Sequence, residues 1–86
     1  MLQVRLTHGY FRTARRLAPA GSSTAKKLAE TLRSLAVEPV PADSDTPDLI
    51  PPVIECRARR VPGTALLVLY ERDGDLVRVL AVRVGA

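Results

Sequence analysis

The stretch Thr64–Ala86, TALLVLYERDGDLVRVLAVRVGA, predicts two apolar strands, Leu66–Glu71 and Leu76–Val84, joined at Asp73-Gly74. An Asp-Gly pair between apolar runs is a strong hairpin signal, because both residues tolerate the positive φ of tight turns. Both strands carry apolar residues at consecutive positions, so each face of this hairpin needs a covering layer. What covers the second face is therefore the question that decides the fold and the function.

The composition restricts the class of protein. The chain has 86 residues, of which 47% are apolar and 3% aromatic, so we expect one domain with a core of Leu, Val and Ala. It has no apolar run long enough to cross a membrane and no visible secretory signal, so we expect a cytoplasmic protein that does not bind membranes. One cysteine, Cys56, excludes an internal disulfide, and with one histidine, His8, neither a metal site nor a cofactor is expected.

The net charge of +4 is unevenly distributed along the chain. Residues 1–36 contain seven Lys/Arg against one acid, and residues 56–86 contain six Arg against three acids. Residues 37–55 contain five acids and no base. Two basic blocks around an acidic segment indicate an anionic partner, which is either a nucleic acid or an acidic protein segment.

The first half of the chain predicts a strand and two helices. Residues 2–6 alternate apolar and polar, and Thr7 is a suitable N-cap for a helix that ends before Pro19. The apolar stripe of this helix consists of Phe11, Ala14, Leu17 and Ala18. A second helix runs from Ser22 or Ser23 to about Val37, because Leu28, Leu32 and Leu35 repeat at helical spacing. A short turn joins the two helices, so we expect an antiparallel helical hairpin.

The second half predicts a loop and three strands. Residues 38–52 contain five prolines and four acids, which predicts a Pro/Asp-rich loop. Residues 53–59 alternate as a strand, and Pro62-Gly63 has the residues of a tight turn before the closing hairpin. We therefore expect a single α+β domain over residues 1–86 with the order β-α-α-β-β-β. Its helical hairpin packs on one face of a small, mostly antiparallel sheet.

Three stretches of the chain resemble the RelE/ParE family of bacterial type II toxins. They are VRLTHGYFRTARRL, TAKKLAETLRSLAVEP and RVPGTALLVLYERDGDLVRVLAVRV, which run nearly from end to end. The resemblance implies a toxin whose sheet has one face covered by the helical hairpin and one concave face. It also implies an antitoxin that wraps over the toxin. In the RelE branch the target is mRNA on the ribosome, whereas in the ParE branch it is DNA gyrase.

The chain departs from the family pattern at two basic positions. The strand before Tyr70 commonly reads aromatic, Arg, apolar, apolar, Tyr in the family, and here Leu67 replaces that Arg. The family often ends with a His-Arg pair, whereas here Arg83 is the nearest basic residue. Cleavage of RNA needs cationic donors at the phosphate and a general acid or base. These departures favour a toxin that binds a protein over one that cuts RNA.

The candidate site residues fall into three groups. The weak catalytic candidates are Arg57, Arg59 and Arg83. The partner-binding candidates are an aliphatic strand face with a basic rim, consisting of Ala65, Leu67, Leu69, Val77, Val79, Arg57 and Arg59. The nucleic-acid-binding candidates are Lys26, Lys27 and Arg12. A solvated polar face is the alternative interpretation for every basic residue in these sets.

Three further residues are expected to have structural rather than chemical roles. Tyr70 shares the parity of Leu66 and Val68 and should pack under the helices. Cys56 should fill apolar space, and His8 should lie at the surface beside a helix start. The leading hypothesis is a ParE-like toxin that binds gyrase or a similar protein. The alternatives are a RelE-like ribosome-dependent ribonuclease, and a non-toxic interaction module that forms a homodimer through the exposed sheet face.

Overall fold

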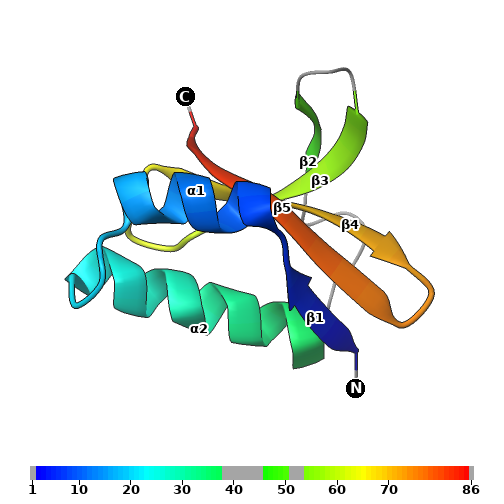
Figure 1. Cartoon of the computed structure of the whole chain (residues 1–86), viewed down its shortest axis with the longest axis horizontal. Helices are drawn as coiled ribbons and strands as arrows, with labels where there is room; N and C mark the ends of the chain where they lie inside the picture. The colour runs from blue at the N-terminus through cyan, green and yellow to red at the C-terminus, as the bar shows by residue number, and fades with distance from the viewer. Residues whose placement is uncertain (1, 38–45, 51–53, 86) are drawn as a thin grey trace.

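The computed structural model describes residues 2–37, 46–50 and 54–85. The elements in chain order are β1 (Gln3–Leu6), α1 (His8–Leu17), α2 (Ser23–Val37), β2 (Thr46–Ile50), β3 (Ile54–Arg60), β4 (Leu66–Asp73) and β5 (Leu76–Val84). The strands form one sheet in the order β1-β5-β4-β3-β2, with both helices against one face (Figure 1). Only the pairing of β1 with β5 is parallel. The predicted α+β class, with a helical hairpin on a mostly antiparallel sheet, is confirmed.

The segment predicted as a loop at 38–52 contains one additional strand. Thr46–Ile50 pair with β3 along their whole length, from Thr46 opposite Ala58 to Ile50 opposite Ile54. Proline has no N–H to give to a ladder, but an edge strand tolerates it because one side of its backbone has no neighbouring strand. Pro47 therefore fits in β2, which is the edge of the sheet. The other residues of the predicted loop, 38–45 and 51–52, lie outside the described residues.

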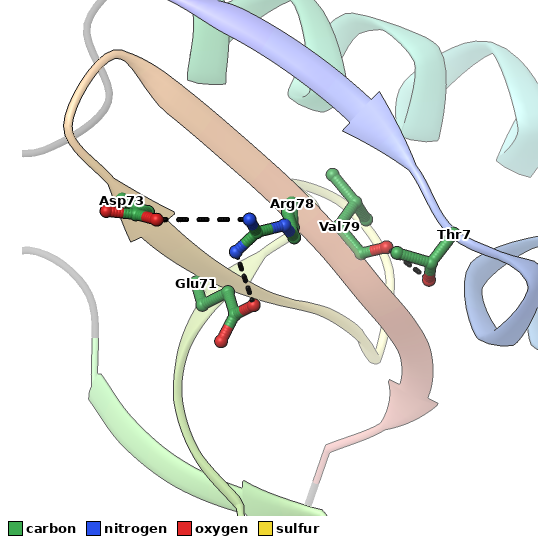
Figure 2. Close-up of polar contacts among 5 residues, drawn as sticks. All are labelled: Thr7, Glu71, Asp73, Arg78 and Val79. Atoms are coloured by element: carbon green, nitrogen blue, oxygen red, sulfur yellow. Dashed lines mark hydrogen bonds and ion pairs between the residues drawn. The ribbon is translucent and has the colours of Figure 1, made fainter.

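The start of α1 is fixed to β5 by the side chain of Thr7. Its Oγ1 accepts a hydrogen bond from the Tyr10 N–H at 3.3 Å, which confirms the predicted N-cap. The same hydroxyl donates to the Val79 carbonyl of β5 at 2.7 Å (Figure 2). One side chain therefore both begins the helix and positions it on the sheet.

Helix α1 continues along the part of β5 that β1 does not reach. β1 pairs with residues 76–79 of β5 only. Beyond this point the N–H of Val82 donates to Thr13 Oγ1 at 2.8 Å, and the backbone of Gly9 lies directly against the Leu80 carbonyl. An unpaired strand edge would leave backbone groups without partners. Helix α1 takes the place of a neighbouring strand at this edge.

The main core lies between the helices and the sheet. Its fully buried members on β4 and β5 include Val68, Tyr70, Val77 and Val79, and Leu28 and Leu35 cover them from α2. From α1 the core receives Tyr10, which is 7% exposed, while Phe11 is 52% exposed. The prediction that Phe11 faces the core is therefore wrong. Because Gly9 and Thr13 contact β5, the helix is rotated so that Tyr10 and Ala14 face the sheet. The burial of Tyr10 also raises the pKa of its hydroxyl group above the ordinary value of 10.0.

Both turns that the sequence predicts in the second half of the chain are present in the structure. Gly63 has φ +75° after Pro62, and the Thr64 N–H donates to the Val61 carbonyl at 3.2 Å, which confirms the predicted turn. The closing hairpin is also confirmed, with its two loop residues at Gly74 and Asp75, one position later than expected. Gly74 has φ +60° at the first loop position, as a type II′ turn requires.

A bulge in β5 changes which residues share a face of the sheet. Tyr70 pairs with Val79 and Leu69 pairs with Ala81, so Leu80 is an extra residue in β5. Val77 and Val79 therefore lie with Tyr70 under the helices, each 0% exposed. The prediction that they share a face with Leu69 is wrong. The hairpin turn lies one residue later than expected, and the bulge at Leu80 reverses the alternation of the residues that follow it.

We expect Gly9→Ala to destabilise the protein by about 1–3 kcal/mol, although alanine favours helices. A Cβ at this position would lie 2.5 Å from the Leu80 backbone oxygen, so the helix would have to move away from β5. The measurement is the free energy of unfolding in urea. Arg12→Ala, at an exposed site of the same helix, is the control and should change it by less than about 0.5 kcal/mol. Equal effects of the two changes would contradict the close contact.

We expect Thr13→Val to lower the free energy of unfolding by about 1–2 kcal/mol, because the Val82 N–H loses its acceptor. Thr24→Val is the matched control, since Thr24 is also a half-buried helical threonine and its hydroxyl makes none of the hydrogen bonds found in the described parts of the chain. Amide hydrogen exchange at Val82 should accelerate in Thr13→Val only. Unchanged exchange at Val82 would show that the hydroxyl does not protect this edge.

Candidate functional site

The face of the sheet opposite the helices, called the open face here, carries a small aliphatic cluster. Its buried members are Cys56, Ala58 and Leu69, and Leu67, Leu80 and Ala81 are partly buried around them. Cross-strand pairing explains the grouping, because Leu69 lies opposite Ala58 on β3 and Ala81 on β5. The cluster has its own packing, separate from the core under the helices.

Leu67 and Arg83 lie next to each other on the open face. They are register partners on β4 and β5, so their side chains leave the sheet on the same side. Gly85 packs against Leu67, and a Cβ at Gly85 would lie 2.7 Å from the Leu67 side chain. The position at which the family resemblance places an Arg is therefore filled by an aliphatic side chain with close neighbours.

An ion pair lies on the open face near the hairpin turn. The Arg78 Nη1 lies 3.1 Å from Glu71 Oε1, and its Nη2 lies 3.9 Å from Asp73 Oδ2 (Figure 2). Both Arg78 and Glu71 keep 36% of their side-chain surface exposed, so the pair is solvated. The carboxylates compensate the charge of Arg78, which makes this part of the face a poor site for phosphate.

The predicted partner-binding residues are divided among three environments. Ala65 is exposed and Leu67 is half-buried, so both can contact a partner. Leu69 lies on the open face as expected, but it is 1% exposed, so a partner can touch it only after a rearrangement. Val77 and Val79 belong to the core under the helices, as described above. The accessible aliphatic surface is therefore smaller than the sequence suggested.

Arg57 and Arg59 do not form a rim of the open face. They lie opposite Tyr70 and Val68, which places them on the side of the helices. The Arg59 Nη1 donates to Ser34 Oγ of α2 at 3.1 Å. The alternation of β3 was predicted correctly, but the face on which its arginines lie was predicted wrongly. Cys56 and Ala58 pack with Leu69 on the open face, so the arginines point toward α2.

Basic side chains meet in a pocket between α2 and the end of β3, called the cationic pocket here. Its volume is about 190 Å³, and its lining is Lys27, Glu30, Thr31, Ser34, Arg59, Arg60 and Pro62. The pocket joins one nucleic-acid candidate, Lys27, with one catalytic candidate, Arg59. Thr31 and Ser34 were not singled out from the sequence. A signal was present, because Lys27, Thr31 and Ser34 follow one another at helical spacing on α2.

The other basic candidates are dispersed over the surface. Lys26 on α2 and Arg12 on α1 are exposed and line neither of the described pockets. Arg83 lines a second, more apolar pocket of about 270 Å³ with Arg16, Leu17, Val82 and Val84. Arg57, Arg59 and Arg83 therefore do not converge on one point, and their joint catalytic role is not supported by their positions.

The remaining candidates have the expected structural positions. His8 is exposed at the start of α1, Cys56 is buried in the open-face cluster, and Tyr70 is fully buried in the core. Within residues 2–37, 46–50 and 54–85 there is no group of three or more His, Cys, Asp or Glu side chains that could hold a metal ion. No helix in these ranges is both long and apolar enough to cross a membrane.

The comparison with solved structures identifies the fold. A metal-bound toxin from Helicobacter pylori aligns over 98% of this chain and 94% of its own, with a TM-score of 0.67 and 16% identity. A copper-bound mutant toxin from the same organism aligns over the same shares, with a TM-score of 0.65 and 15% identity. No protein-family model and no curated protein matches the sequence. The chain thus has the fold of these small toxins, although its sequence is far from theirs.

We expect the Arg78–Glu71 pair to contribute only about 0.2–1 kcal/mol to stability, because both side chains are solvated. A double-mutant cycle of Arg78→Gln and Glu71→Gln, followed by urea unfolding, measures this coupling. The coupling should shrink when salt is raised. A coupling free energy above about 2 kcal/mol that does not change with salt concentration would mean that the pair is part of the structural core of the open face.

Proposed function

We propose that this chain is a RelE/ParE-type toxin of a type II toxin–antitoxin system that acts by binding a protein. The target would be DNA gyrase or a similar bacterial protein in the cytoplasm, and an antitoxin would be the silencing partner. The fold of the H. pylori toxins supports the toxin class. The family resemblance in the sequence supports the RelE/ParE type.

The observation that carries the mode of action is the pairing of Leu67 with Arg83 on the open face. A ribonuclease needs several cations around the scissile phosphate and a group that moves a proton. Here Arg83 lies beside Leu67 and shares a mostly apolar pocket with Arg16 and Leu17, and Glu71 is engaged with Arg78. His8, the single histidine, lies at the start of α1. An aliphatic surface with a few charges at its margin is typical of a protein interface.

The RelE-like ribonuclease remains the second candidate because of the cationic pocket, which has Lys27, Arg59 and Arg60 in its lining. This pocket lacks histidine, and its one carboxylate is Glu30. The third candidate is a non-toxic interaction module that dimerises through the open face. The three candidates differ in what happens when the chain is produced in a bacterium and when it is added to isolated targets.

The test is expression in a bacterium, together with assays of gyrase supercoiling and of mRNA integrity on translating ribosomes. We expect growth arrest and loss of gyrase activity, or of another isolated target, with intact mRNA. Leu67→Arg should weaken inhibition at least about tenfold, because it places a charge in the aliphatic surface. Leu32→Arg is the matched control, since Leu32 is also half-buried but lies on α2 and lines neither described pocket. Circular dichroism confirms that both variants fold.

Three outcomes would contradict the proposal. Codon-positioned cleavage of mRNA that is lost in Arg83→Ala or Arg59→Ala would establish the ribonuclease. Growth without arrest and a concentration-dependent dimer would establish the non-toxic module. Equal loss of inhibition in Leu67→Arg and Leu32→Arg would show that the open face is not the binding surface.

A further inference from the structure

We propose that the cationic pocket binds a phosphate group, either as inorganic phosphate or as the phosphate of a nucleoside monophosphate. The inference does not rest on the proposed toxin function. The pocket is formed by α2, β3 and the turn at Pro62, on the side of the sheet where Arg59 contacts α2. It is therefore separate from the aliphatic cluster of the open face.

The charges in the pocket favour a small anion. Lys27 and Arg59 line the pocket from the side of the helices, and Arg60, the register partner of Leu67, adds to the lining at the end of β3. The lining also includes the carboxylate of Glu30. In the described part of the chain, the Lys27 ammonium has neither a hydrogen-bond acceptor nor a carboxylate within bonding distance. Within the described ranges, Arg60 makes only a long contact, from Nη1 to the Thr64 carbonyl at 3.5 Å. Clustered cations of this kind are the usual partners of phosphate oxygens.

Hydroxyl groups on α2 orient one of these cations. Ser34 Oγ accepts from Arg59 Nη1 at 3.1 Å and donates to the Thr31 carbonyl at 2.6 Å. Thr31, which is 5% exposed, donates its hydroxyl to the Lys27 carbonyl at 3.0 Å. The arginine is thus held by a chain of hydrogen bonds that runs along α2. A pre-ordered guanidinium loses less entropy when an anion binds.

The turn after β3 positions the second cation. The Lys27 side chain lies over Gly63, where a Cβ would be 3.0 Å from Nζ. Gly63 has φ +75°, a conformation that favours glycine, and the absence of a Cβ leaves room for the Lys27 side chain. Pro62 precedes it and lines the pocket. The ammonium group therefore lies beside this turn, in the lining of the pocket.

The size of the pocket restricts the ligand to a small group. Its volume of about 190 Å³ is below the ~300–1,000 Å³ of pockets that hold drug-sized ligands. A phosphate and a few waters fit this space, whereas the base and sugar of a nucleotide would remain outside. A phosphate carries up to two charges and several acceptor oxygens, so it can contact Lys27 and Arg59 together.

The test is a titration of the isotope-labelled full chain with inorganic phosphate at constant ionic strength, followed by amide chemical shifts. We expect saturable shifts at residues of the pocket, including Thr31 and Ser34. Lys27→Ala and Arg59→Ala should each weaken binding about tenfold, which corresponds to about 1.4 kcal/mol. Lys26→Ala removes the same charge one residue away and should weaken binding less than about twofold.

The outcomes separate a built site from a general charge effect. Equal weakening by Lys26→Ala and Lys27→Ala, or identical shifts with acetate, would overturn the proposal. A parallel titration with adenosine monophosphate identifies the source of the phosphate. Tighter binding with new shifts outside the pocket assigns the site to nucleotides, and equal binding assigns it to free phosphate; either result supports the phosphate site.

Discussion

The contact between α1 and β5 is the constraint on which the rest of the structure depends. β1 is too short to pair with the whole of β5, and α1 supplies the missing partners through Thr7, Gly9 and Thr13. This contact sets the rotation of the helix, so that Tyr10 enters the core and Phe11 remains outside. It also fixes the layer against which α2 and the helix-side residues of β4 pack.

The two faces of the sheet receive different chemistry from the same strands. Alternation along β3 directs Cys56 and Ala58 to the open face and Arg57 and Arg59 toward the helices. On β5 the valines before the bulge face the helices, whereas Leu80 and Ala81 at the bulge lie on the open face. As a result, an aliphatic surface and a cationic pocket occupy opposite sides of a small domain. The surface proposed for a protein partner and the pocket proposed for phosphate are therefore separated by the sheet.

Local signals allowed the hairpins, the helices and the Thr7 cap to be predicted, because each depends on residues close in sequence. The errors concern long-range packing. Phe11 and Tyr10 are adjacent, and only the approach of α1 to β5 decides which of them is buried. The bulge at Leu80 has no marker in the sequence, and the face taken by Arg59 depends on pairing with β4. The strand β2 was likewise not predicted because its segment is rich in proline. An edge strand tolerates proline, whereas a central strand does not.

The position of β5 has a consequence for the synthesis of the protein. β5 lies between β1 and β4, yet it is the last strand in the chain. The hydrogen bonds from Thr7 to Val79 and from Val82 to Thr13 join residues 72 and 69 positions apart. During translation, β1 and α1 therefore cannot complete these contacts until residues 79–82 have left the ribosome. A truncated product that ends before β5 lacks Leu80 and Ala81 of the open face and the hydrogen bonds that hold α1 on the sheet.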